Sequence, residues 1–259
     1  AIPADGISPV DARMIAELKP AYLRDTIDLT GSGWTDRWAA ARAAAARIGC
    51  GLELEVLLDA DERAAPAAAE LAERLAADGI GASARETAVR LLPYAKGAVA
   101  SDEATLRAVR EAMRDRGLNV PLGGGSRAYY AEFNRAALPL GSMDFAAYTI
   151  NPQVHAFDDR SLMETLAAQR VTAADAAAKS GKPLSIGPIT FKPRLNPNAT
   201  SGDGSIPVAE QADDRQGAEF GAAWTLGSLA ALCMPEARRL TYYEASGPLG
   251  LVRDGSAIP

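Results

Sequence analysis

The sequence is poor in the residues from which protein metal sites are built. It contains a single histidine, His155, and two cysteines, Cys50 and Cys233, that lie far apart. A zinc site of the HExxH type needs two histidines, an amidohydrolase-type centre needs several, and a thiolate cluster needs neighbouring cysteines. Because none of these sites can be assembled from this sequence, we expect no metal and no other cofactor.

Long apolar runs and clusters of basic residues are also missing. A membrane-spanning helix needs about twenty consecutive apolar residues, and a nucleic-acid footprint needs grouped lysines and arginines. The sequence has neither, its net charge is −6, and its first residues do not follow the order of a secretion signal. Both cysteines lie in apolar, helix-like segments and are expected to be small buried residues. We therefore expect a cytoplasmic protein with no membrane or nucleic-acid partner.

Strand-like apolar runs alternate with helical stretches rich in Ala, Arg and Glu. Strands are predicted at 22–30, 52–59, 87–94, 119–125, 145–153, 183–191 and 239–246, and helices at 35–49, 65–79, 101–117, 128–136, 159–181 and 215–233. Thr35 and Ser101 are the predicted N-caps of two of these helices. The strands are almost continuously apolar, which is typical of a parallel sheet covered on both faces.

Seven strand-then-helix units in 259 residues predict an α/β fold, the (β/α)₈ TIM barrel. A doubly wound open sheet is the main alternative. No GxGxxG follows the first strand and no Walker loop occurs, which disfavours nucleotide binding. Because no helical pattern follows the last strand, we expect the eighth unit to be weak or missing. We expect residues 1–259 to form a single barrel domain of a longer protein with flanking domains.

Two carboxylates at the carboxyl ends of predicted strands are candidates for catalysis, because the active site of a barrel forms there. Glu244 closes an apolar strand, and alternation predicts that Leu240, Tyr242 and Glu244 share the side that faces the barrel axis. Glu132 follows the fourth strand. Two such carboxylates are suited to general acid/base or nucleophilic catalysis at a carbon like the anomeric carbon of a sugar. The alternatives are that Glu244 is a solvated loop acid and that Glu132 caps a helix or pairs with Arg135.

Three polar residues, Asn151, Gln153 and His155, end the fifth strand at every second position. Capping a strand does not require three such groups, so we expect them to bind substrate, with His155 donating to a substrate oxygen or orienting a carboxylate. The alternative for His155 is a hydrogen bond to the backbone of a neighbouring loop.

The glycine run at 123–125 is followed by Ser126, which matches the first part of the G-x-S-x-G elbow of serine hydrolases, but Ala128 replaces the last glycine. We therefore favour a simpler interpretation, in which the glycines let backbone approach a ligand or make room beside the barrel axis.

The long loop at 191–207 is polar and rich in turn residues, which is typical of a lid or a ligand wall. Its Lys192 and Arg194 are candidates for binding a carboxylate or phosphate, and the alternative is that both are solvated. Aromatic residues near the strand ends are candidates for a sugar platform, with core packing of Trp224 as the alternative. These aromatic residues are Tyr129, Tyr130, Tyr242, Tyr243 and Trp224.

Five segments together resemble the central barrel domain of the D-apionate lactonases, bacterial enzymes that open the lactone of a branched-chain sugar acid. They are GGGSRAYYAEFNR, TINPQVHAFDD, IGPITFKPRLNPNAT, FGAAWTLGSL and TYYEASGPLG, in order between about residues 20 and 252. One departure is GGGS, which stands where the family has a GGT-like turn, although Ser126 keeps a small hydroxyl. A more distant likeness is to retaining glycosidases, in which an acid/base follows strand four and a nucleophile follows strand seven; Glu244 matches the nucleophile.

These resemblances imply a mechanism for opening the planar, electrophilic C1 of D-apionolactone. Glu244 attacks the carbonyl or activates a water, and Glu132 or His155 protonates the departing ring oxygen. The implied substrate-binding residues are Asn151, Gln153, Arg127, Tyr242 and Asn134, of which Asn151, Gln153 and Arg127 hold the hydroxyls and the oxyanion. The alternatives are a retaining glycoside hydrolase acting on a small glycoside and a barrel that binds sugars without turnover.

Overall fold

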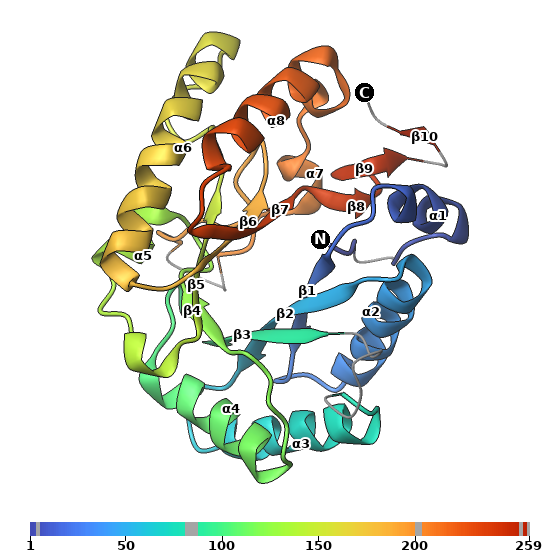
Figure 1. Cartoon of the computed structure of the whole chain (residues 1–259), viewed down its shortest axis with the longest axis vertical. Helices are drawn as coiled ribbons and strands as arrows, with labels where there is room; N and C mark the ends of the chain where they lie inside the picture. The colour runs from blue at the N-terminus through green and yellow to red at the C-terminus, as the bar shows by residue number, and fades with distance from the viewer. Residues whose placement is uncertain (4–5, 81–87, 200–203, 254–255, 258–259) are drawn as a thin grey trace.

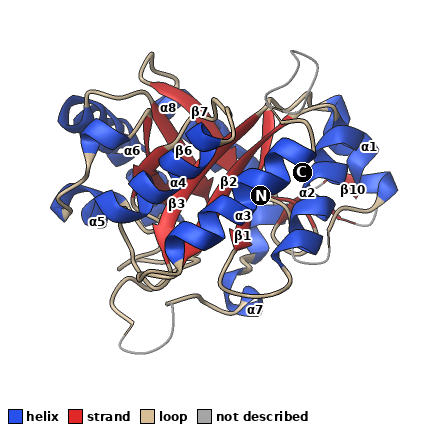
Figure 2. Cartoon of the chain, turned by 90° about the horizontal axis from the view of Figure 1, so that it is seen from below, coloured by secondary structure: helices blue, strands red, loops and turns tan. Residues whose placement is uncertain are grey.

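The computed structural model describes residues 1–3, 6–80, 88–199, 204–253 and 256–257. Parallel strands run through the middle of the molecule and helices surround them (Figures 1 and 2). The central strands are β1 Tyr22–Asp28, β2 Gly51–Leu58, β3 Val89–Ala95, β4 Gly123–Gly125, β5 Phe145–Ile150, β6 Leu184–Ile189 and β7 Ala237–Tyr242. The predicted strands thus lie within a few residues of the observed ones.

In the described ranges, six helices follow strands as the alternating pattern predicts, whereas the first helix, which precedes β1, and the short seventh helix were not predicted. The helices are α1 Pro9–Glu17, α2 Trp34–Ile48, α3 Ala64–Ala77, α4 Glu103–Asp115, α5 Tyr130–Arg135, α6 Asp159–Ser180, α7 Val208–Gln211 and α8 Glu219–Leu232, with short 3₁₀ turns at Leu140–Ser142 and Asp214–Gly217. Within the described ranges, none of these helices has the length and apolar character that crossing a membrane requires.

The central strands form two parallel sheets, β1-β2-β3 and β4-β5-β6-β7, which meet at a bridge between Leu91 and Leu122. After β7, the described part of the chain has only short strands, β8 Glu244–Ser246, β9 Gly250–Arg253 and β10 Ser256–Ala257, and no further helix. This confirms the TIM barrel with a weak last unit.

The seam between the last and first strands is filled by the extended residues Ala1 and Ile2. The Ile2 amide donates to the Arg24 carbonyl at 2.9 Å, and the Ala245 amide donates to the Ala1 carbonyl at 2.7 Å. The Ala1 nitrogen also donates to the Tyr243 carbonyl at 2.6 Å. Figure 1 accordingly shows the first residues beside β8 and β1.

The glycine run of β4 makes room at the barrel axis. A Cβ on Gly123 would lie 2.2 Å from Cε2 of Phe145, and one on Gly125, where φ is +141°, would lie 2.0 Å from the Ala147 carbonyl oxygen. Phe145 and Ala147 belong to a small apolar cluster with Leu57, Leu92 and Tyr94 that fills this part of the barrel interior. The prediction that these glycines make room beside the barrel axis is confirmed.

Five expectations about individual residues can be compared with the structure. Thr35 lies inside α2, whose N-cap is Gly33, and the side-chain cap of α4 comes from Asp102, so both N-cap predictions are wrong by one or two positions. Cys50 is buried as predicted, but Cys233, the residue that ends α8, is exposed, so the prediction for Cys233 is wrong. Trp224 is fully buried, which confirms its core role.

Candidate active site

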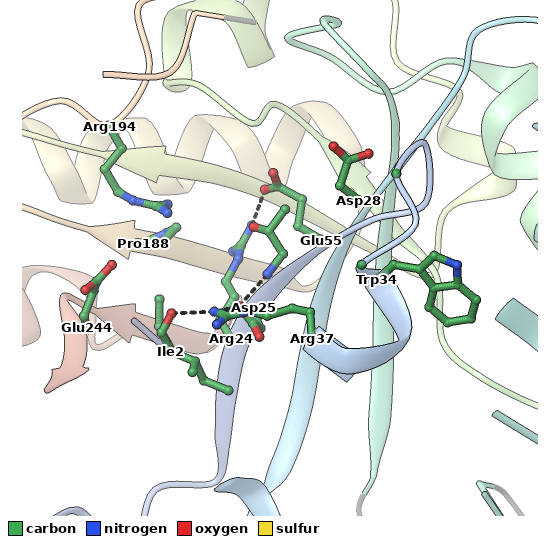
Figure 3. A pocket seen from close by; sticks show the side chains of 14 residues that line it. Ile2, Arg24, Asp25, Asp28, Trp34, Arg37, Glu55, Pro188, Arg194 and Glu244 are labelled. Atoms are coloured by element: carbon green, nitrogen blue, oxygen red, sulfur yellow. Dashed lines mark hydrogen bonds and ion pairs between the residues drawn. The ribbon is translucent and has the colours of Figure 1, made fainter. Parts of the chain in front are cut away.

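A hollow of about 490 Å³ opens at the carboxyl ends of β1 and β2, beside Glu244 (Figure 3). We call it the charged hollow, because ionisable side chains make up much of its wall. These are Arg24, Asp25, Asp28, Arg37, Glu55, Arg194 and Glu244.

The floor of the charged hollow is built from charges that lie inside strands. Arg24 on β1 and Glu53 and Glu55 on β2 are all buried. Arg24 lies between the two carboxylates, with Nη1 3.5 Å from Glu53 and Nη2 3.7 Å from Glu55, and it donates to the Gly187 carbonyl at 2.5 Å. Because each of these charges is buried, each is stabilised mainly by its partners.

Glu55 is held as an ionised group by two arginines. Arg127, which follows β4, donates from Nε to Glu55 at 2.7 Å. Burial alone would raise the pKa of Glu55, but Arg127 and Arg24 together keep it below its usual value. Arg127, predicted to hold substrate oxygens, therefore lies in the structure as the partner of Glu55, one layer behind the hollow.

Glu244 reaches the hollow because the backbone reverses its side-chain alternation just before it. Tyr243 has φ of +49°, a left-handed conformation that is uncommon for a bulky residue. The Tyr242 hydroxyl pairs with Ser228 of α8 at 2.8 Å, while Glu244 lines the hollow. The prediction that Tyr242 and Glu244 share a side is therefore wrong, and Tyr242 faces the helix layer.

The Glu244 carboxylate makes no hydrogen bond or ion pair within the described ranges of the chain. Burial raises its pKa, and nearby positive charges, among them Arg194, partly oppose this rise. Figure 3 shows the Arg194 guanidinium beside the Glu244 carboxylate, with both side chains directed into the hollow. A carboxylate with a raised pKa and a free lone pair is suited to act as a general base.

Asp25 is a second carboxylate of the hollow with a raised pKa. Burial is the main cause, and Arg37, which donates to Oδ1 at 2.5 Å, opposes it. The other oxygen, Oδ2, is buried without a hydrogen-bond partner. Within the described ranges, no three His, Cys, Asp or Glu side chains come together as a metal-binding group.

A second, larger hollow of about 850 Å³ lies on the other side of the barrel mouth. We call it the amide hollow. Its polar lining includes Tyr129, Glu132, Arg135, Asn151, Gln153, His155, Asn196, Asn198, Ser205 and Glu210. The structure thus brings together Asn151, Gln153, His155 and Glu132, four of the predicted site residues.

The side chains of the amide hollow differ in how far they are engaged. Gln153 donates to the Phe191 carbonyl at 3.0 Å and to Asp213 at 2.6 Å. Arg215 and Gln153 lower the pKa of Asp213 to about 2. His155 is exposed, and no hydrogen bond to a loop backbone is found for it in the described part of the chain. Gln153 therefore supports the wall, whereas His155 stands at the rim.

Glu132 is engaged in its own helix. It occupies the third position of α5, where its Oε2 accepts from the Tyr129 amide at 3.2 Å, and its Oε1 lies 3.9 Å from Arg135. The alternative in which Glu132 caps a helix and pairs with Arg135 is confirmed.

The two hollows are divided by the segment after β6. Arg194 lines the charged hollow, while its neighbours Pro193 and Leu195 line the amide hollow. The Tyr129 hydroxyl donates to the Leu195 carbonyl at 2.6 Å and fixes this segment. Glu244 and Glu132 therefore line different hollows.

Two further candidates lie outside both hollows. Asn134 is exposed on α5, and its backbone carbonyl accepts from Lys179 of α6. Ser126 is fully buried, and its hydroxyl donates to the Val99 carbonyl at 3.0 Å. A serine nucleophile at this position has no support from the geometry.

Sequence reasoning missed Arg24, Asp25 and Glu55 because it examined only the ends of strands. The signal was present in LELEVLL, where Glu53 and Glu55 alternate with apolar residues, whereas the adjacent Arg24 and Asp25 of YLRDTID show no such alternation. A charge at every second position of an otherwise apolar barrel strand points toward the axis.

Comparison with known proteins agrees with the barrel fold. Residues 7–259 match the family model described as "D-apionate lactonase, TIM barrel domain". A D-apionate lactonase of Brucella anthropi is 33% identical over 138 residues, which are 51% of this chain and 23% of that protein, so the matched part is less than a quarter of its relative.

Two solved structures share the fold at low sequence identity. A β-1,3-glucanosyltransferase of Rhizomucor miehei has a TM-score of 0.60 at 13% identity, and the match covers 100% of this chain and 93% of the transferase chain. The β-glucuronidase of Ruminococcus gnavus has a TM-score of 0.59 at 8% identity, and the match covers 96% of this chain and 44% of the glucuronidase chain. These likenesses show the barrel alone. On the strength of the family match, the chain belongs to the D-apionate lactonase family, of which it is the TIM barrel domain.

Proposed function

We propose that this barrel hydrolyses a sugar lactone in the charged hollow, with D-apionolactone as substrate and D-apionate as product. The observation that carries the proposal is the Glu244 carboxylate, which points into the hollow beside Arg194 and has a pKa raised by burial. The volume of about 490 Å³ suits one small sugar. Membership of the lactonase family supports the reaction class.

In this mechanism Glu244 is first a base and then an acid. It takes a proton from a water while the water oxygen bonds to the lactone carbonyl carbon. The carbonyl oxygen becomes negatively charged, and the Arg194 guanidinium stabilises it. When the intermediate collapses, the bond from carbon to ring oxygen breaks, and protonated Glu244 returns its proton to that oxygen. The products are a free hydroxyl and a carboxylic acid, which loses its proton to solvent.

The placement of Glu132 favours lactone opening over glycoside hydrolysis. A retaining glycosidase needs two carboxyl groups about 5 Å apart that act on the same bond. Glu132 is engaged in the α5 cap and lines the other hollow. Lactone opening needs only the single carboxylate that the charged hollow offers free of partners.

We also propose that the protein is cytoplasmic and that further domains flank the barrel. The length of the Brucella anthropi relative, of which the match covers 23%, supports the flanking domains.

The test is proton release in a weakly buffered indicator assay, with full-length protein and a panel of aldonolactones that includes D-apionolactone. The wild type is expected to release protons quickly, Glu244→Gln to lose this activity, and the matched control Glu132→Gln to keep it. If no lactone is opened above background, the proposal fails. Turnover of aryl glycosides would then identify a glycosidase, and sugar binding without turnover would identify a binding barrel.

A further inference from the structure

A third cavity, of about 370 Å³, lies outside the barrel wall between β5 and α6. We call it the α6 cavity. Tyr129, Tyr130 and Tyr148 contribute to one side of it, and Asn151 and Gln169 add amide groups. Tyr148 packs against Tyr130 edge to face, with the ring centroids 5.8 Å apart, so this wall is stiff. The cavity shares Tyr129, Asn151, Val154 and His155 with the amide hollow but no residue with the charged hollow.

Polar atoms without partners gather in the α6 cavity. Tyr148 is fully buried, Gln169 is 3% exposed and Asn151 is 9% exposed. The Gln169 amide nitrogen and both amide atoms of Asn151 have no hydrogen-bond partner, and the Tyr148 hydroxyl makes no hydrogen bond of ordinary geometry, although Thr172 lies near it. They are four of the eight buried side-chain atoms in this condition in the described part of the chain. Each unpaired buried polar group costs about 1–3 kcal/mol, so their grouping in one cavity indicates a site.

The geometry of these groups is held by neighbouring contacts. The Gln169 carbonyl oxygen accepts from Ser228 of α8 at 2.5 Å, which leaves its amide nitrogen free to donate. The Thr172 hydroxyl donates to the Gln169 backbone carbonyl at 3.1 Å. The free atoms are therefore preorganised around the cavity.

The lining also defines the chemistry of a ligand. Within the described residues, no Lys, Arg, Asp or Glu lines the α6 cavity, and its one imidazole, that of His155, is exposed, so a charged molecule would be desolvated in the interior of the cavity without a partner there. The free atoms include a donor at Gln169, both a donor and an acceptor at Asn151, and a hydroxyl at Tyr148 that can act as either. Hydroxyl groups both donate and accept, and they complement this set. The aromatic rings and the apolar side chains of Ile150 and Val154 suit the C–H faces of a sugar.

We propose that the α6 cavity is a second binding site, separate from the charged hollow, for a small uncharged polyol or sugar. This proposal is independent of the proposed lactonase reaction.

The experiment is calorimetric titration of the full-length protein with three uncharged probes, xylitol, D-xylose and myo-inositol, and with D-xylonate as the charged counterpart. At least one uncharged probe is expected to bind with an affinity near the millimolar range, and D-xylonate to bind at least about tenfold more weakly. Tyr148→Phe removes only the unpaired hydroxyl and is expected to weaken probe binding about tenfold.

Two control variants separate this site from its neighbours. Tyr130→Phe changes the same wall, but its hydroxyl bonds to Asp175, so probe binding is expected to stay unchanged. Glu244→Gln alters the charged hollow and is likewise expected to leave probe binding unchanged. The proposal is overturned if none of the uncharged probes binds, if Tyr148→Phe binds them as well as the wild type does, or if Glu244→Gln abolishes their binding.

Discussion

The charged hollow and the amide hollow share one barrel mouth but are built in different ways. In the charged hollow, Arg24 and Glu55 come from inside β1 and β2 and are locked together by ion pairs in the barrel interior. In the amide hollow, Asn151 and His155 come from the segment after β5 and lie opposite the long loop after β6. The first hollow is therefore rigid and electrostatic, whereas the second combines several neutral amides with a few charged side chains.

This difference bears on where catalysis takes place. Preorganised charges in a low-dielectric wall stabilise a developing charge without reorganising during the reaction. Only the charged hollow combines such charges with a carboxylate free of partners, Glu244, among the residues the structure describes. The amide hollow offers groups that recognise hydroxyls. The four predictions below would break or sharpen this division.

The largest effect is expected from removing the charge at the floor of the charged hollow. Arg24→Met leaves Glu53 buried without one of its cations and should lower the free energy of unfolding by about 3–5 kcal/mol. The matched control is Arg160→Met, whose exposed pair with Glu164 has an N–O distance of 2.9 Å and is worth less than about 1 kcal/mol. Urea unfolding measures both variants. Equal midpoints for the two would show that the buried pair does not support the hollow.

The next effect concerns turnover. Arg194→Gln removes the group that we propose stabilises the oxyanion, and it should lower kcat about 10²- to 10³-fold. His155→Ala, in the amide hollow, should lower it less than about threefold. Steady-state kinetics with the best lactone of the panel measures both. A larger loss for His155→Ala than for Arg194→Gln would move the chemistry to the amide hollow.

The pH dependence of kcat/KM is a more subtle probe of Glu244. As a base it must be ionised, and burial raises its pKa above the ordinary value of 4.5. The value of kcat/KM should therefore begin to fall, as the pH is lowered, at a pH above 4.5. The midpoint of this acidic limb gives the pKa of Glu244 in the free enzyme. Because Arg194 lowers the pKa of Glu244, the residual activity of Arg194→Gln should show this limb at higher pH. If the acidic limb of Arg194→Gln lies at the same pH as that of the wild type, the group that titrates is not Glu244.

The smallest effect is expected from Glu132. Glu132→Ala removes the carboxylate that caps α5 and should destabilise the protein by about 1 kcal/mol, with kcat/KM unchanged. Thermal unfolding and the lactone assay measure the two quantities. A loss of activity beyond the loss of folded protein would restore Glu132 as an acid in the reaction.

The barrel fold could be predicted from the sequence because it follows from the order of the strand and helix patterns and from their composition. Continuous apolar strands alternating with helical stretches leave few other folds, and the glycines of β4 were interpreted correctly as making room. Glu244 was singled out because it lies near the end of the seventh predicted strand, and in the structure it opens β8 and lines the charged hollow. Tyr242 was misplaced because one residue, Tyr243, takes a left-handed conformation that a period-two argument does not include.

The division of the barrel mouth into two hollows could not be predicted from the sequence, for a different reason. It depends on how loops from distant strands pass one another, as when Tyr129 meets the Leu195 carbonyl. Such contacts follow from tertiary packing and leave no periodic pattern. Arg24 and Glu55, in contrast, were visible as charges in apolar strands and can be found in other barrels by the same signal.

The seam of the barrel has a consequence for the order of events during synthesis. The contact between Ala1 and Tyr243 joins positions that are 242 residues apart. The first strand can pair with the second, and on its other edge with Ile2, as soon as these residues have left the ribosome, but the outer edge of Ala1 and Ile2 has to wait for nearly all of this segment. Contacts of such long range are slow to form. Until they form, this outer edge is exposed to pairing with other chains, and a chaperone that covers it would raise the yield of folded protein.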